Sequence, residues 1–119
     1  MRLEARKLLQ DVSNAAARIV RFTAGKALQD YSGDDFLRSA VERQFEIIGE
    51  ALNRLRRDDP ATAERVTAID RIIGYRNVLA HGYDTVDDEI SWDAVEFKLP
   101  VLRREVEELL TEGGLAEEA

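Results

Sequence analysis

The sequence has 119 residues, of which 45% are hydrophobic and 34% are charged, a balance typical of one globular domain with much charged helix surface. It contains no cysteine, which excludes a disulfide framework and thiolate metal sites. No apolar run approaches the ~20 residues of a membrane span, so we expect a cytoplasmic protein with no membrane attachment. The formal net charge is −7, and the acidic excess lies in residues 84–119. A nucleic acid would therefore bind to basic side chains in residues 1–83.

Three helical stretches are predicted ahead of the acidic part. Apolar residues at intervals of three and four predict a first helix over residues 3–28 and a second over residues 35–57. Pro60 should close the second helix, because the residue before a proline is pushed out of helical geometry. The third stretch covers residues 61–80, as a short helix followed by a longer one from Ile69.

A last helix is predicted to begin near Asp88, where acidic side chains favour the positive end of the helix dipole. Pro100 should kink this helix without ending it, because the apolar stripe continues to Leu109. Residues 111–119 have too little apolar content to stay folded, so we expect a helical domain over residues 1–110 and a flexible acidic tail. The fold class is therefore all-α, an up-down bundle of four to five helices with a kinked last helix.

One short segment concentrates the residues that could cleave a phosphodiester. Arg76 can hold a phosphate with a planar fork of donors, and His81, the only histidine, can exchange a proton near neutral pH. Asn77 offers a donor and an acceptor, and Tyr83 adds a hydroxyl. Five residues of straight helix leave Arg76 and His81 about 140° apart around the axis, so they converge only if the helix loosens near its end. On spacing alone, the favoured explanation is structural, with His81 as a helix cap and Arg76 as a surface charge.

Other charged groups are better explained by structure than by chemistry. Arg43, Glu46 and Glu50 lie three and four residues apart on the second helix, which is typical of a surface ion-pair network. The acidic residues of the segment 84–89 lack the central glycine and alternating ligands of a calcium loop, so helix capping accounts for them. The chain has no Gly-rich phosphate loop, and we expect no metal and no cofactor.

The pattern Arg76-x-x-x-x-His81-x-Tyr83 resembles the signature of HepT-like toxins in the HEPN superfamily. The similarity extends over almost the whole chain, because the family's second helix, active-site segment and kinked last helix have counterparts in the same order. The segments concerned are residues 41–51, 72–83, 89–93 and 99–102.

The resemblance implies the toxin of a toxin–antitoxin system, a metal-independent endoribonuclease that acts as a homodimer on RNA and not on DNA. Arg76 would bind the scissile phosphate and stabilise its developing charge. His81 would take the proton of the ribose 2′-hydroxyl or protonate the leaving oxygen, and Asn77 would position one of these groups. The need for a 2′-hydroxyl restricts the substrate to RNA.

The resemblance also implies a partner, a small nucleotidyltransferase antitoxin of the MNT type that transfers AMP to Tyr83. The added charge and bulk, two residues from His81, would block RNA by repulsion and occupancy. The acidic surface keeps an alternative open, a non-catalytic helical subunit that binds this nucleotidyltransferase and is modified by it. A helical bundle without an active site is a third interpretation, in which these polar residues would not gather.

Overall fold

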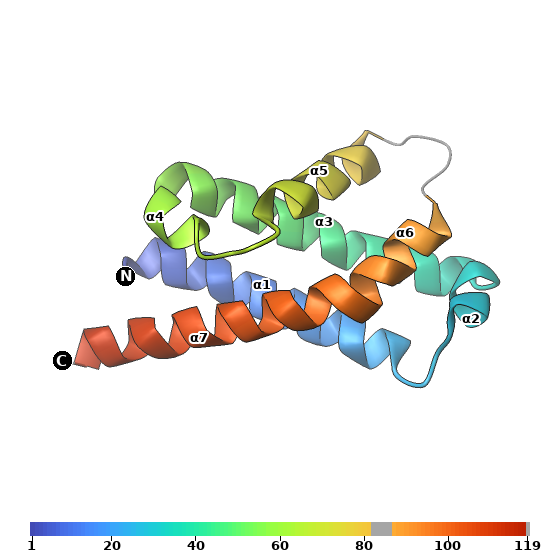
Figure 1. Ribbon diagram of the computed structural model, residues 1–119, viewed down its shortest axis with the longest axis horizontal. Helices are drawn as coiled ribbons and strands as arrows, with labels where there is room; N and C mark the ends of the chain where they lie inside the picture. The colour runs from blue at the N-terminus through green and yellow to red at the C-terminus, as the bar shows by residue number, and fades with distance from the viewer. Residues whose placement is uncertain (82–86, 119) are drawn as a thin grey trace.

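The computed structural model describes residues 1–81 and 87–118, and every regular element in this part of the chain is helical (Figure 1). This confirms the predicted all-α fold class. The elements in chain order are α1 (Leu3–Thr23), α2 (Leu28–Ser32), α3 (Asp35–Asp58), α4 (Pro60–Ala63), α5 (Ile69–Ala80), α6 (Asp88–Asp93), the π-helical turn η1 (Ala94–Lys98) and α7 (Leu99–Glu118). None of the helices described combines the length and the apolarity that crossing a lipid bilayer requires.

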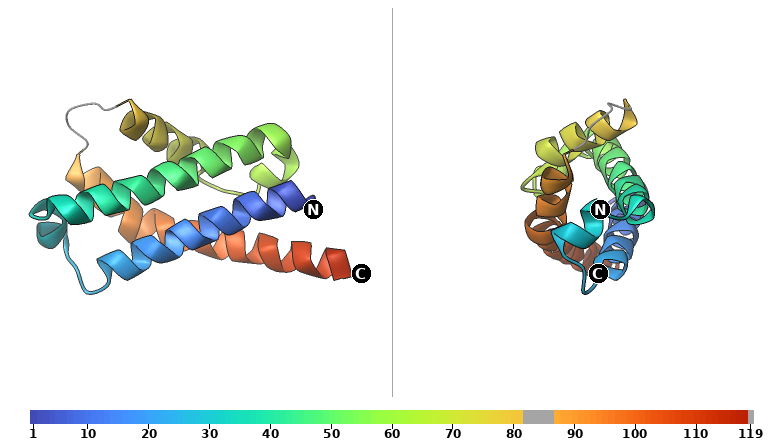
Figure 2. Two further views of the ribbon diagram at one scale, coloured as in Figure 1. Left: turned by 180° about the vertical axis from the view of Figure 1, so that it is seen from behind. Right: turned by 90° about the vertical axis from the view of Figure 1, so that its right-hand side faces the viewer.

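The longer helices pack side by side with alternating direction. α5 lies against α3, α3 against α1, and α1 against α7, an order that is visible from behind in Figure 2. The first and last helices therefore bring the two chain ends to the same end of an elongated molecule of 49 × 29 × 19 Å (Figure 1). This arrangement is the up-down bundle that the sequence predicts.

Apolar residues at helical spacing form the core between these helices. The stripes predicted on the first, second and last helices are all turned inward, and each fully buried aliphatic side chain contributes about 1.5–3 kcal/mol through the hydrophobic effect. Among the buried aliphatic side chains are Leu9, Val12 and Ile19 on α1, Val41, Ile48, Leu52 and Leu55 on α3, and Leu99, Leu102, Val106 and Leu109 on α7.

The first helix ends at Thr23 and not at Leu28, where the sequence analysis places its end. The Thr23 hydroxyl donates a hydrogen bond at 2.8 Å to a carbonyl one turn earlier, which competes with the backbone ladder. Gly25 follows with a φ of +72°, a conformation that favours glycine, and it redirects the chain. The Asp30 carboxylate accepts a hydrogen bond from the Ala27 backbone N–H at 2.8 Å, which starts α2 as a separate short helix.

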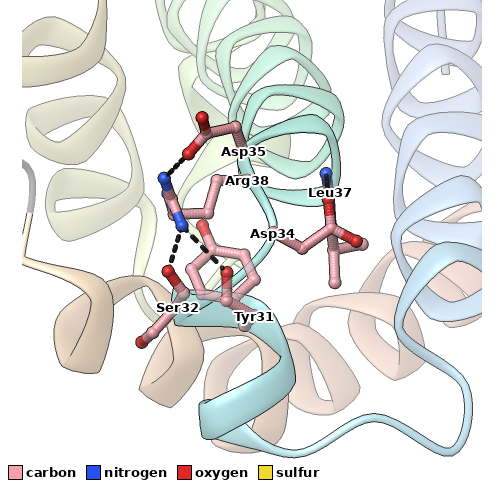
Figure 3. A network of polar contacts seen from close by, with 6 residues as sticks. All are labelled: Tyr31, Ser32, Asp34, Asp35, Leu37 and Arg38. Carbon is pink, nitrogen blue, oxygen red and sulfur yellow. Dashed lines mark hydrogen bonds and ion pairs between the residues drawn. The ribbon is translucent and has the colours of Figure 1, made fainter.

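Figure 3 shows how the turn between α2 and α3 is fixed. The Asp34 carboxylate caps α3 by accepting a hydrogen bond from the backbone N–H three residues later, at 3.0 Å. The Arg38 guanidinium reaches back to α2, where it donates to the carbonyl oxygens of Tyr31 and Ser32, and it also pairs with Asp35. The start of α3 is thereby held against α2.

The connection that leads into α5 is held by α7. α3 ends just before Pro60, as predicted. In the loop that follows α4, the backbone N–H and the hydroxyl of Thr67 both donate to the Glu105 carboxylate. Arg65 forms an ion pair with Glu112, one of two α7 carboxylates that anchor this loop. These contacts set where α5 begins.

Pro100 lies at the start of α7, directly after the turn in which the last helix changes direction (Figure 1). In η1 the backbone N–H of Leu99 bonds to the carbonyl of Ala94, one residue further back than in an α-helix. Pro100 itself has no N–H to offer to the preceding turn. The Trp92 indole donates to the Glu96 carboxylate at 2.6 Å across the same turn. The helix is therefore continuous and bent, as predicted, although the sequence does not predict the π turn.

The backbone of α7 continues as helix to Glu118, where the sequence analysis expects a flexible tail after residue 110. Gly113 is buried, and a Cβ added to it would lie 3.2 Å from the Met1 sulfur at the start of the chain. The helix therefore packs against the N-terminus for about one turn beyond residue 110. The division into a domain and a flexible tail stays a prediction.

Candidate active site

α5 carries the predicted site and is fixed on two sides. Ile72 and Ile73 are buried in the core. The Tyr75 ring packs edge-on against Phe45 of α3, with the ring centroids 5.3 Å apart and an interplanar angle of 82°. Its hydroxyl forms a hydrogen bond with the Ser91 hydroxyl of α6. The second half of α5 is thus tied to both α3 and α6.

A buried polar cluster lies at this contact. Ser91 is 1% exposed, and its hydroxyl is hydrogen-bonded to the hydroxyl of Tyr75. Burial raises the pKa of Tyr31 to about 12 and also raises the pKa of Tyr75, so both phenols stay neutral at pH 7. The pKa of Glu42 is raised, first by burial and then by the nearby carboxylate of Asp88. The sequence does not predict this cluster, because its members come from four elements and share no local spacing.

The Arg76 side chain projects from α5 on the side that faces α3. Its side chain is half-buried, and its first carbons lie directly over Gly49. The guanidinium Nη1 donates to the side-chain oxygen of Asn77 at 3.0 Å. Within residues 1–81 and 87–118 no carboxylate forms an ion pair with Arg76. The guanidinium charge is therefore not neutralised by a partner in this part of the protein, which suits a group that binds an anion.

His81 is the C-terminal cap of α5, and its side chain is exposed. Its backbone N–H bonds to the carbonyl of Asn77 at 3.1 Å, and its ring Nδ1 lies 2.6 Å from the same oxygen. Because a carbonyl can only accept, Nδ1 carries the proton in this contact, and Nε2 is the ring atom that can take up and release another. The helix cap uses the backbone N–H and Nδ1 of His81, whereas a role in proton transfer would use Nε2. His81 can therefore be both a helix cap and a catalytic residue.

Asn77 connects the two predicted catalytic groups. Its side-chain oxygen accepts from Arg76 and its backbone carbonyl accepts from the His81 ring. Arg76 and His81 therefore each contact Asn77, the first at its side chain and the second at its backbone. Tyr83, the predicted AMP acceptor, lies outside the described residues.

The remaining charged candidates have structural roles. Arg43 and Glu46 form an ion pair at 3.4 Å on the surface of α3, as the surface interpretation predicts. The Asp87 carboxylate accepts a hydrogen bond from the backbone N–H of Glu89 at 2.8 Å and caps α6, as the capping interpretation predicts. Among the residues that the structure describes, no group of three or more metal-ligating side chains is positioned to hold an ion.

Gly49 is the contact residue at this site that the sequence analysis overlooks. It lies inside a helix whose spacing assigns it no role, and only the proximity of α5 reveals what it faces. A glycine in the interior of a strongly periodic helix is the one signal that could have drawn attention to it.

A family profile described as ribonuclease HepT-like matches residues 12–109, which contain α5 and the three residues joined at Asn77. The chain belongs to the HepT-like ribonuclease family. This membership confirms the resemblance stated from the sequence, and with it the prediction that the chain is a ribonuclease whose substrate is RNA.

Several relatives of this HepT-like chain span nearly its whole length. A candidate RNase of Methanocaldococcus jannaschii is 29% identical over 104 residues, which cover 87% of this chain and 94% of the relative. A candidate RNase of Caldanaerobacter subterraneus is 29% identical over 105 residues, covering 88% and 93% of the two chains. A Thermococcus cleftensis protein named for ribonuclease HepT is 31% identical over 113 residues, covering 92% and 98%. No solved structure gives a significant match to the chain.

Proposed function

We propose that this HepT-like chain is the toxin of a toxin–antitoxin system and that it cleaves RNA internally, without a metal ion, through Arg76 and His81. The observation that carries the proposal is the pair of hydrogen bonds by which Arg76 and His81 both contact Asn77 at the end of α5. Family membership supplies the reaction class, and this local arrangement supplies the groups that the reaction needs.

The proposed reaction begins with the ribose 2′-hydroxyl. His81 Nε2 takes its proton while the 2′-oxygen forms a bond to phosphorus, and the bond from phosphorus to the 5′-oxygen breaks. The departing 5′-oxygen takes a proton from water, so the products are a 2′,3′-cyclic phosphate and a free 5′-hydroxyl. Arg76 binds the non-bridging phosphate oxygens, where negative charge grows in the transition state. Asn77 holds the imidazole and the guanidinium near the same helix end.

A homodimer forms part of the proposal. Two large apolar side chains are exposed near the site, Val78 on α5 at 39% and Ile90 on α6 at 57%. Exposed apolar groups of this kind favour burial against another chain. Sedimentation of the purified chain and of a Val78→Asp variant tests this, because a dimer that uses this surface is weakened by the buried charge.

We also propose that a nucleotidyltransferase antitoxin neutralises the toxin by transferring AMP to Tyr83. Support comes from the sequence, in which Tyr83 follows His81 by two residues, so that an attached phosphate lies close to the catalytic imidazole. The α-phosphorus of ATP forms a bond to the tyrosine oxygen, and pyrophosphate leaves. The negative charge and bulk of AMP then exclude an RNA phosphate from the site.

A second function has one observation in its favour, the net charge of −7, which is unusual for a protein that binds RNA. In this alternative the chain is a non-catalytic subunit that binds the nucleotidyltransferase and is modified by it. Expression of the chain alone separates the two functions. A toxin halts growth in a manner that Arg76→Ala abolishes, whereas a non-catalytic subunit leaves growth unchanged in both forms.

The experiment that tests the proposed reaction is cleavage of a defined RNA by the purified chain in EDTA. The proposal predicts internal cuts that leave 2′,3′-cyclic phosphate ends. It also predicts that an RNA with 2′-deoxyribose at the cut position is not cleaved there, because the nucleophile is missing. Cleavage of the deoxy-substituted position, or cleavage that depends on added metal ions, would contradict the proposal.

A further inference from the structure

α3 and α5 approach each other closely where Gly49 faces Arg76. A Cβ added to Gly49 would lie 2.2 Å from the Cβ and 2.6 Å from the Cγ of Arg76. It would also lie 3.4 Å from the carbonyl oxygen of Ile72, which is an ordinary contact. The conflict is therefore with the Cβ and Cγ of Arg76, and no residue other than glycine fits at position 49 while the residue at position 76 carries a Cβ in this place.

The backbone at Gly49 does not itself demand glycine. Gly25 is the one glycine with a positive φ in the described part of the chain, whereas Gly49 lies in the regular interior of α3. Glycine in a helix interior is less stable than alanine, because it loses more backbone freedom on folding. The close approach of Arg76 supplies the reason for glycine at this position.

The consequence for Arg76 is a side chain held at its base. Its Cβ and Cγ lie against the α3 backbone, its side chain is half-buried, and its Nη1 bonds to Asn77 at 3.0 Å. A side chain restrained at both ends loses less freedom when it binds a phosphate than one that extends freely into solvent. We propose that Gly49 is a positioning residue that directs Arg76 toward the scissile phosphate. This inference rests on the proposed function, because it assumes that Arg76 acts in cleavage.

The chain offers a matched control on the facing helix. Gly74 lies two residues before Arg76 in α5, and a Cβ added to it would meet no atom within 4 Å. Gly49→Ala and Gly74→Ala therefore make the same chemical change on either side of one helix pair. Only the first change displaces Arg76.

The experiment compares kcat per folded molecule for RNA cleavage in EDTA, at a temperature where circular dichroism shows every variant folded. Gly49→Ala is expected to lower kcat about a hundredfold, as a misplacement of about 1 Å can do. Gly74→Ala should cleave at about the wild-type rate. In the Arg76→Gly background, which lacks the clashing Cβ and Cγ, Gly49→Ala should cause no additional loss, because the added methyl group has no side chain at position 76 to displace.

A kcat of the wild-type size for Gly49→Ala would overturn the inference and leave the proposed function standing. A further loss from Gly49→Ala in the Arg76→Gly background would also overturn it, since the glycine would then act through other groups. Wild-type cleavage by Arg76→Ala itself is a different result, which contradicts the proposed function and this inference together. If Gly49→Ala does not fold, Gly49→Ala/Arg76→Gly moves the missing Cβ to the other helix and should recover the helical signal. No recovery would overturn the inference.

Discussion

Ser91 lies at a junction where one small substitution should have a large effect on stability. Its hydroxyl is hydrogen-bonded to the hydroxyl of Tyr75, and its side chain is almost completely buried. A buried hydroxyl that loses its partner costs about 1–3 kcal/mol. Because Ser91→Ala leaves the Tyr75 hydroxyl without its partner, we expect a loss of about 1–3 kcal/mol in the free energy of unfolding. Tyr75→Phe leaves the buried Ser91 hydroxyl without its partner and should also cost about 1–3 kcal/mol.

Urea unfolding followed by circular dichroism measures both losses, and thermal unfolding should show a Tm lowered on the order of 10 °C for Ser91→Ala. Ser39→Ala is the matched control, because Ser39 is exposed on α3 and its substitution should change stability by less than about 0.5 kcal/mol. A loss for Ser91→Ala no larger than the loss for Ser39→Ala would refute the role of the Ser91 hydroxyl as the partner of Tyr75.

Three further predictions concern the core, the acidic group near α6 and the modified tyrosine. Ile48→Ala should lower the free energy of unfolding by about 2–5 kcal/mol, whereas Ile90→Ala, at a position 57% exposed, should change it little, and equal losses would contradict the assigned core. Glu42 has a raised pKa in the folded protein, so the folded state binds its proton more tightly and stability falls as the pH rises toward that pKa. Glu42→Gln should therefore raise the unfolding midpoint at pH 7 and have little effect near pH 4, and the opposite pH dependence would contradict this sign. Tyr83→Phe should abolish labelling by the partner nucleotidyltransferase with radioactive ATP, and undiminished labelling would place the acceptor elsewhere.

Much of the fold follows from local signals in the sequence. The helix predicted over residues 35–57 is observed over Asp35–Asp58, because Asp34 caps its start and Pro60 prevents its continuation. The end of the first helix is predicted too late. Its apolar spacing continues past Thr23, while the hydroxyl of Thr23 and the positive φ of Gly25 end the helix there.

The last helix shows a different limit. Pro100 predicts a bend in the last helix, because proline has no backbone N–H to bond to the preceding turn. The π turn over Ala94–Lys98 depends on how the neighbouring side chains pack, and the Trp92 to Glu96 hydrogen bond across it has no signature in the apolar period. Periodicity thus predicts that the helix continues but not how the chain accommodates the proline.

The candidate site divides in the same way. The spacing of Arg76, Asn77 and His81 is local and could be predicted, and so could the cap formed by His81. The contact between Arg76 and Gly49 joins residues of two helices, and the distance between those helices is not contained in the period of either. The positions that hold a catalytic side chain in place are therefore harder to predict than the side chain itself.

The cleavage rates of Arg76→Ala and His81→Ala test the central claim most directly. Each variant should cleave a defined RNA in EDTA at least about a hundredfold more slowly than the wild type. Arg71→Ala, which removes an exposed arginine from the same helix, should retain most of the activity. Wild-type rates for Arg76→Ala and His81→Ala, in preparations that are fully folded, would contradict the assignment of the active site to the end of α5.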